Sequence, residues 1–378
     1  MEKSMIGLLA LIAAAMLASC SAPETPRVAA WEPAPQLAAQ ERRSALAGAA
    51  PLRLLRTIPL PGVEGRFDHF ALDARRQHLF VAALGNDMLE VLDLRSGKRL
   101  RSLRGLSEPT GVAFVAPSNR VFAASGEGAQ CAILDGATFA EVGSAPGLPD
   151  ADNVRYDEAA RQIYVGYGDG ALGILDAATG QRLGDIPLAA HPEAFQLERF
   201  GRRIFVNVPG AGHIAVIDRL KRAVVATWPT QGTPEGARSN FPMALDEVGH
   251  RLFIGCRSPA RVLVYDTSSG KVVTALEIGG DTDDLFFDAA RKRLYVSCGS
   301  GEINVFQARD TNHYALLATI PTAPGARTSF FSPDFDRLYL AVPHRGEQAA
   351  EIRLYAAAPS TVPQDKPGKL LHHAQRQQ

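Results

Sequence analysis

The sequence is poor in cysteine and tryptophan and carries no net charge. Only four of its 378 residues are Cys and two are Trp, and 40 Lys and Arg residues balance 40 Asp and Glu residues. A chain without net charge has no overall field that would attract nucleic acid or an anionic membrane surface. We therefore expect no nucleic-acid partner, and any function must reside in a local site.

Several catalytic and cofactor motifs are also missing. The sequence contains no C-x-x-C-H haem attachment, no G-x-S-x-G nucleophile elbow, no H-E-x-x-H zinc motif and no phosphate-binding P-loop. These absences favour a non-catalytic role and leave a divalent metal ion as the one cofactor still to be considered.

A hydrophobic run occurs only at the N-terminus. Lys3 precedes an apolar stretch at residues 5–17 that is short for a membrane span and ends in small residues, which is typical of a secretory signal. Leu17-Ala18-Ser19-Cys20 resembles the bacterial lipobox, in which the signal is cut before a cysteine that is then acylated. An ordinary signal peptide is the alternative. Lipidation of Cys20 would anchor the protein in the bacterial cell envelope, and Ser21 favours the outer membrane, facing the periplasm.

The composition divides the rest of the chain into three parts. Residues 21–51 are rich in Ala and Pro without alternation and predict a flexible tether after the signal at 1–20. Residues 359–378 have a similar character and predict a disordered tail. The globular domain is expected at 52–358.

A repeat runs through this domain. An aromatic residue preceded by an aliphatic one recurs at spacings of 42, 42, 41, 48, 42 and 44, at Phe80, Phe122, Tyr164, Phe205, Phe253, Tyr295 and Tyr339. About thirteen residues after the aromatic, five of the repeats place an aspartate at the end of a further strand, namely Asp93, Asp135, Asp176, Asp218 and Asp266. A period in the low forties with four short strands predicts an all-β, seven-bladed β-propeller of four-stranded antiparallel blades.

The seventh repeat is one strand short. It supplies strands at about 328–333, 337–343 and 351–356, which would leave an unpaired outer edge. Residues 54–59, LLRTIP, match LLATIP at 316–321, the fourth strand of repeat six. We therefore expect the N-terminal strand to close the ring against blade seven.

These repeats resemble the YVTN-repeat (YncE-like) propellers of bacterial envelopes. The segments that carry the resemblance lie within residues 52–356 and are LFVAALGNDMLEVLD, IYVGYGDGALGILD, IFVNVPGAGHIAVID, LFIGCRSPARVLVYD and LYVSCGSGEINVF. The resemblance implies the propeller fold and an envelope location, but no single activity, because propellers host many functions.

The cysteines outside the lipobox are Cys131, Cys256 and Cys298. Cys256 and Cys298 occupy the same repeat position, so their side chains should point the same way from two stacked sheets rather than toward each other. We expect unpaired, buried cysteines that fill space between blades.

Candidate functional residues gather where each innermost strand begins, a place that faces the mouth of the central channel. The positions twelve residues before the aromatics are Asp68, Thr110, Asp152, Glu193, Phe241, Asp283 and Arg327. Together with their neighbours they predict a ligand-binding set of Asp68, His69, Asp152, Asn153, His191, Glu193, Arg238, Asn240, Asp283, Asp284 and Arg327. Four acids form the candidate metal set: Asp68, Asp152, Glu193 and Asp283.

Two interpretations of this ring remain open. Asp and Asn are common turn residues because they hydrogen-bond their own backbone. Crowded carboxylates, however, repel one another, and protonation, a bound cation or an arginine partner relieves the repulsion. Oxygen ligands suit Ca²⁺ or Mg²⁺, and the two histidines would admit a transition metal.

Three functions follow as hypotheses. The first is a non-catalytic, lipid-anchored propeller that binds a small polar ligand, a metal ion or a peptide at its channel mouth. The second is a metal-dependent hydrolase similar to the propeller lactonases. The third is an envelope assembly scaffold that contacts another envelope protein through a blade face or rim.

Overall fold

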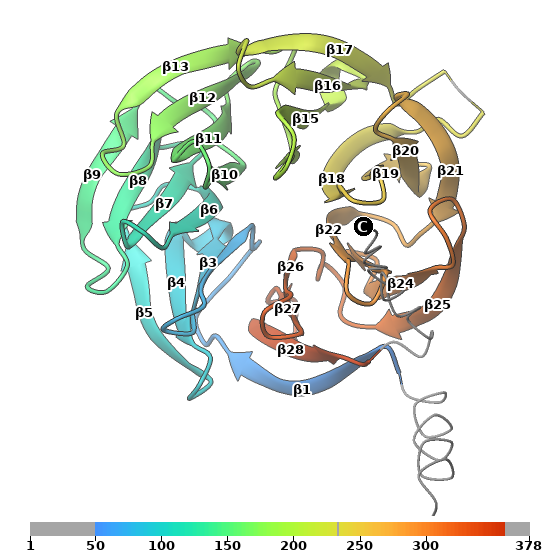
Figure 1. Ribbon diagram of the computed structural model, residues 1–378. Coiled ribbons are helices and arrows are strands. Elements are labelled where there is room, and N and C mark those ends of the chain that lie inside the picture. Colours follow the sequence, from blue (N-terminus) through green and yellow to red (C-terminus); the bar gives the residue numbers. More distant parts are fainter. Residues whose placement is uncertain (1–49, 233, 360–378) are drawn as a thin grey trace, which may run out of the picture. The chain divides into compact units, whose positions relative to one another are not determined.

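The computed structural model describes residues 50–232 and 234–359 of the chain. The predicted signal with Cys20, nearly all of the predicted tether and the tail beyond Pro359 lie outside the described residues. The described part forms seven four-stranded antiparallel sheets arranged in a ring (Figure 1), so the predicted seven-bladed propeller is confirmed.

Each of the first three blades runs from the channel outward in chain order. Blade 1 contains β2 (Phe70–Asp73), β3 (His78–Ala83), β4 (Met88–Asp93) and β5 (Lys98–Arg104). Blade 2 contains β6 (Pro109–Val115), β7 (Arg120–Ser125), β8 (Gln130–Asp135) and β9 (Glu141–Pro146). Blade 3 contains β10 (Val154–Asp157), β11 (Gln162–Tyr167), β12 (Ala171–Asp176) and β13 (Arg182–Pro187).

The next three blades repeat this order. Blade 4 contains β14 (Phe195–Leu197), β15 (Arg203–Val208), β16 (His213–Asp218) and β17 (Ala223–Pro229). Blade 5 contains β18 (Arg238–Asp246), β19 (Arg251–Ser258), β20 (Ala260–Asp266) and β21 (Lys271–Glu277). Blade 6 contains β22 (Thr282–Asp288), β23 (Arg293–Cys298), β24 (Glu302–Ala308) and β25 (Tyr314–Pro321).

Blade 7 joins the two ends of the domain, as predicted. Its inner strands are β26 (Ser329–Ser332), β27 (Arg337–Val342) and β28 (Glu351–Ala357), and its outer strand is β1 (Leu52–Pro59). β1 pairs antiparallel with β28, and the Ala358 amide donates to the Pro51 carbonyl at 2.9 Å. The unpaired edge anticipated for blade 7 is therefore covered.

The repeated aromatics lie in the core between blades. All seven side chains are at most 2% exposed. The buried apolar residues form seven clusters, and each cluster joins two neighbouring blades. Phe80 of blade 1, for example, packs with Val121 of blade 2. The sequence period therefore repeats because every interface needs the same apolar filling.

The repeated aspartates after the third strands have a local structural role. Asp135 accepts hydrogen bonds from the amides of Ala137 and Thr138, and Asp93, Asp176, Asp218 and Asp266 cap their turns in the same way. These amide donors stabilise the ionised carboxylate, and they hold the pKa of Asp135 at about 2. These five residues are turn aspartates rather than site residues.

The expectation for the cysteines is also met. Cys131, Cys256 and Cys298 are buried and unpaired. The only helical elements of residues 50–232 and 234–359 are two short 3₁₀ turns, η1 (Leu84–Asn86) and η2 (Pro209–Ala211). In this described part, no helix has the length and apolar character needed to cross a membrane.

Candidate functional site

The inner strand of every blade pairs with the second strand in one common register. In all seven blades the residue nine positions before the repeated aromatic pairs with that aromatic, as Arg155 does with Tyr164 and Phe286 with Tyr295. The residue three positions earlier must then reach the channel mouth in each blade. All seven of these residues line one cavity of about 300 Å³: Asp68, Thr110, Asp152, Glu193, Phe241, Asp283 and Arg327. We call it the mouth cavity.

Blade 2 fixes the loop that carries Asp152. The Thr110 hydroxyl donates to the Ala151 carbonyl at 2.7 Å. At Gly111 a Cβ atom would lie 2.1 Å from the Asp152 carbonyl oxygen, so glycine is required by the close approach of the two backbones. The position of Asp152 is therefore set by the contact between blades 2 and 3.

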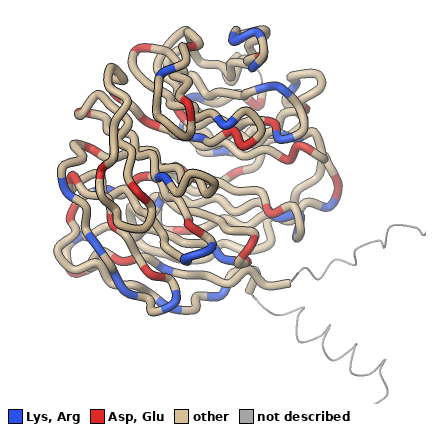
Figure 2. The backbone as a smooth tube through the Cα atoms, turned by 60° about the vertical axis from the view of Figure 1, so that its left-hand side comes forward, with Lys and Arg blue, Asp and Glu red and all other residues tan. Residues whose placement is uncertain are grey.

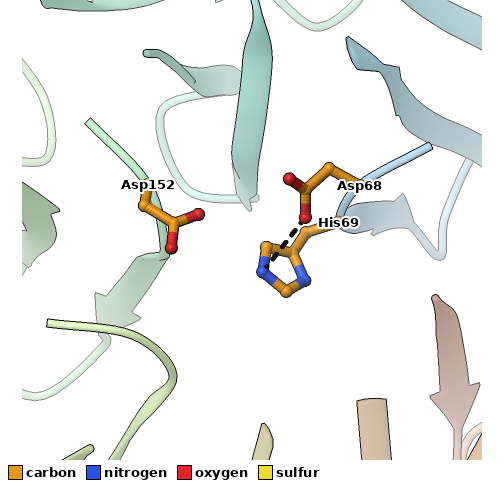
Figure 3. Close-up of side chains that lie close together, drawn as sticks. All are labelled: Asp68, His69 and Asp152. Atoms are coloured by element: carbon orange, nitrogen blue, oxygen red, sulfur yellow. Dashed lines mark ion pairs between the residues drawn. The ribbon is translucent and has the colours of Figure 1, made fainter. Parts of the chain in front are cut away.

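Acidic and imidazole side chains form two overlapping clusters in this cavity. Asp68, His69 and Asp152 make the first, which is drawn in Figure 3, and Asp152, His191 and Glu193 make the second. Within each cluster one ligand atom per residue lies within 4.8 Å of the others. In Figure 3 the Asp152 carboxylate lies to the left of Asp68 and His69, which an ion pair joins. Asp152 belongs to both clusters.

The three carboxyls resist ionisation. Burial, followed by the charge of Asp283, raises the pKa of Asp68 to about 7. The pKa of Asp152 is raised by burial and by Asp68, and the pKa of Glu193 is raised by burial and by Asp152. Removal from water and mutual repulsion both disfavour the charged form, so a cation among them would be stabilised.

The two histidines can each offer a neutral nitrogen. His191 Nδ1 lies 2.7 Å from the Gly168 carbonyl, which only accepts, so Nδ1 carries the proton and Nε2 is left as the ligand atom. His69 has Nε2 at 3.4 Å from Asp68 Oδ1, and burial lowers its pKa. Imidazole nitrogens beside carboxylates form the mixed nitrogen and oxygen donor set that transition metals prefer.

Asp283 differs from the other three acids because two arginines neutralise it. Arg257 Nη2 lies 2.5 Å from Asp283 Oδ1, and Arg327 Nε lies 2.8 Å from Oδ2. Arg327 also contacts Asp281 at 2.7 Å, and the Arg257 guanidinium lies 4.0 Å from the centre of the Phe241 ring. Asp283 and Arg327 line the cavity as predicted, but Asp283 belongs to neither donor cluster.

Three predicted site residues do not line the mouth cavity. Arg238 is exposed where β18 begins, and Asn240 is buried and donates to Asn207 Oδ1 at 3.0 Å. Pairing of β18 with β19 extends back to Arg238 and Ser258, which draws this segment into the blade. Asp284 is buried deeper in the channel, where it accepts from the Ser329 amide at 2.8 Å.

The predicted binding set lacks four charged residues that line the cavity: Arg66, Glu108, Asp150 and Arg257. Arg257 comes from a second strand rather than from the start of an inner strand. A signal was present, because the interval of 48 residues before Phe253 marks blade 5 as irregular. Asn153 does line the cavity and donates to Asp152 Oδ2 at 3.3 Å.

Comparison with known proteins supports the fold. The chain matches no protein-family model and no curated protein in sequence. A chain in the crystal structure of the mitotic checkpoint complex is 13% identical, with a TM-score of 0.68 over 92% of this chain and 99% of that one. A chain of Kuenenia stuttgartiensis hydrazine synthase is 15% identical, with a TM-score of 0.65 over 78% and 98%. At these identities the likeness concerns architecture alone, and the protein is a seven-bladed β-propeller with an acid- and histidine-lined channel mouth.

Proposed function

We propose that this propeller binds a divalent transition-metal ion at its channel mouth and that it does so as a lipid-anchored protein of the bacterial envelope. The observation that carries the metal assignment is the pair of donor clusters that share Asp152. The ligands would be Asp68, His69, Asp152, His191 and Glu193. Three carboxylates would neutralise the ion, and two imidazoles favour a first-row transition metal over Ca²⁺ or Mg²⁺.

The ion pairs of the mouth cavity support a bound cation, rather than an arginine, as the partner of the clustered acids. Among the described residues, no Lys or Arg nitrogen lies within 4.0 Å of a carboxylate oxygen of Asp68, Asp152 or Glu193, whereas Asp283 has two such partners. The same cavity therefore contains one acid in direct contact with arginines and three acids that no described Lys or Arg nitrogen approaches within 4.0 Å. A bound cation would supply that compensation.

The hydrogen bonds argue against a role for Asp152 and Glu193 as plain turn residues. The turn aspartates, such as Asp135, each accept from backbone amides two and three residues further on. In residues 50–232 and 234–359, no backbone amide forms a hydrogen bond with the side chain of Asp152 or Glu193. Their carboxylates therefore do not stabilise a turn through backbone hydrogen bonds, and ligand binding offers an alternative explanation for acids at these positions.

Metal titration of the full-length protein in detergent tests the proposal. After treatment with EDTA and its removal, calorimetry with Mn²⁺, Zn²⁺ and Ca²⁺ should show one site that prefers a transition metal. Asp152→Asn should reduce affinity at least a hundredfold because it removes the ligand that both clusters share. Glu108→Gln is the matched control, since it removes a charge from the same cavity outside the clusters. Equal binding by Asp152→Asn and the parent protein would contradict the assignment.

The envelope location rests on the lipobox and on the resemblance to YVTN-repeat propellers. Cys20→Ala should abolish incorporation of labelled fatty acid and release the protein from the membrane fraction. Labelling that persists in Cys20→Ala would remove the anchor from the proposal without touching the metal site.

A further inference from the structure

A second cavity lies deeper in the channel. It has a volume of about 400 Å³ and is lined by six of the seven inner strands, all except β18. His69 is the only residue that it shares with the mouth cavity. Its walls combine apolar and polar groups and include the aromatic side chains of Phe70, Phe114, Tyr156, Phe286 and Phe330. We call it the inner cavity.

One arginine of β10 lies at the inner cavity. Arg155 lines the inner cavity, and its guanidinium lies 5.7 Å from the centre of the Phe195 ring. Its one side-chain hydrogen bond among the described residues runs from Nη1 to the Val154 carbonyl at 2.9 Å. A guanidinium offers five N–H donors in a planar fork, so most of the donors of Arg155 remain available.

Arg155 also lacks the close acidic partner that Arg257 and Arg327 of the mouth cavity possess. Arg257 lies beside Asp283, and Arg327 beside Asp281. In the described part of the chain, no carboxylate oxygen lies within 4.0 Å of the Arg155 guanidinium. Asp284 also lines the inner cavity, but its contacts are with the Ser329 amide at 2.8 Å and with His69 Nδ1 at 3.7 Å. Arg155 is half-buried, and the charges of Asp284 and Asp152 act on it only from beyond this distance. A bound anion in direct contact would therefore stabilise the guanidinium further.

We infer that the inner cavity is a second binding site, for a small monocarboxylate with an apolar body. Arg155 would receive the carboxylate through two parallel N–H donors, and the aromatic walls would bury the apolar part. The charged and titratable side chains that line the cavity, apart from Tyr156, are Arg155, His69 and Asp284. A single guanidinium matches one negative charge, so a monocarboxylate suits it better than a phosphate dianion.

Calorimetric titration with phenylacetate and with its neutral counterpart phenylacetamide tests this inference. The parent protein, with EDTA present throughout, should bind phenylacetate at least tenfold more tightly than phenylacetamide. Arg155→Gln should lose this preference, because the amide side chain retains hydrogen-bonding groups but no charge. Arg66→Gln is the matched control, since it removes a guanidinium from the mouth cavity and should change phenylacetate affinity less than twofold.

A second variant keeps the test decisive if Arg155→Gln does not fold. Ala113→Phe should fill part of the inner cavity and weaken phenylacetate binding at least tenfold, with metal binding at the mouth unchanged. Equal affinity of the parent protein for the acid and the amide would overturn the inference. So would the absence of phenylacetate binding at about 10 mM, which corresponds to less than about 3 kcal/mol of binding energy. Because EDTA is present, the result does not depend on the proposed metal site.

Discussion

At the residue scale, acids at equivalent repeat positions of the mouth cavity differ in whether an arginine contacts them. Asp68, Asp152 and Asp283 occupy the same repeat position, yet only Asp283 contacts arginines. The difference arises because Arg257 reaches the mouth from β19 of the adjacent blade and Arg327 from the start of blade 7. For Asp68 and Asp152, burial first and a neighbouring carboxylate second disfavour the charged form.

The raised pKa of Asp68, caused by burial and then by the charge of Asp283, predicts a specific pH dependence. The pKa of Asp68 is about 7 in the folded chain, whereas an unfolded Asp titrates near 4. Between these values the folded state binds more protons, so the contribution of Asp68 to stability is fully present below about pH 4 and is lost as pH rises toward 7. Metal-free Asp68→Asn should therefore be more stable than the parent at pH 8, on the order of 1–3 kcal/mol, and nearly equal at pH 4.5.

Thermal unfolding in EDTA at several pH values measures this effect. Asp135→Asn serves as the control, because amide donors hold the pKa of Asp135 at about 2 and its ionisation is complete at both pH values. That variant should lose stability equally at pH 4.5 and pH 8. A parallel loss for Asp68→Asn would show that Asp68 is structural rather than a repelled acid.

At the element scale, the inner strands position the site and β1 maintains the ring. The side chains of Ile58 and Leu60 are at most 1% exposed and pack with Tyr339 and Ile352 of blade 7. β1 therefore contributes backbone pairing to β28 and apolar filling to the interface between blades 7 and 1. Its position in the sequence, more than 290 residues from its partner strand, makes it the one long-range pairing within a blade.

Deletion of residues 52–60 should consequently be severe. It would expose the edge of β28 and open one of the seven interblade cores, so we expect aggregation or a fall in melting temperature of at least about 10 °C. Deletion of residues 21–45 provides the comparison and should change the melting temperature by no more than about 2 °C. Similar melting of the two truncations, measured by circular dichroism, would be incompatible with closure by β1.

At the scale of the whole molecule, stability is distributed around a closed ring. Each of the seven apolar clusters is shared by two blades, so no blade holds a core of its own. Figure 2 shows basic and acidic residues interspersed over the propeller, in keeping with the balanced composition. The ends of the described domain meet at the hydrogen bond between Ala358 and Pro51.

A ring of this kind should tolerate circular permutation in which the new termini lie between the third and fourth strands of another blade. A permuted chain that joins 358 to 51 by a short Gly-Ser linker and opens between Ser268 and Ser269 would close blade 5 by pairing β21 with β20, as β1 pairs with β28 in the parent. We expect a melting temperature within about 5 °C of the parent. Opening between Ile254 and Gly255, inside β19, should instead prevent folding. Comparable yields of soluble protein from both permutations would contradict this account of closure.

The blade number, the strand register and the ring of channel-mouth positions follow from local sequence features. An aromatic recurring about every 42 residues marks equivalent second strands, and antiparallel pairing with the preceding strand sets which residues reach the mouth. The match between residues 54–59 and 316–321 likewise predicts closure, because both segments have the apolar pattern of an outer strand. The cysteines are predictable for the same reason, since equivalent positions share one orientation.

The grouping of the site residues required the folded ring. The channel brings Asp152 of blade 3 beside Asp68 of blade 1, and the pairing of Arg257 with Asp283 joins blades 5 and 6. Arg238 and Asn240 do not line the mouth cavity, because the longer pairing of β18 with β19 includes them in blade 5. Such contacts depend on which side chains meet across the channel, and this depends on the closure of all seven blades rather than on any single repeat.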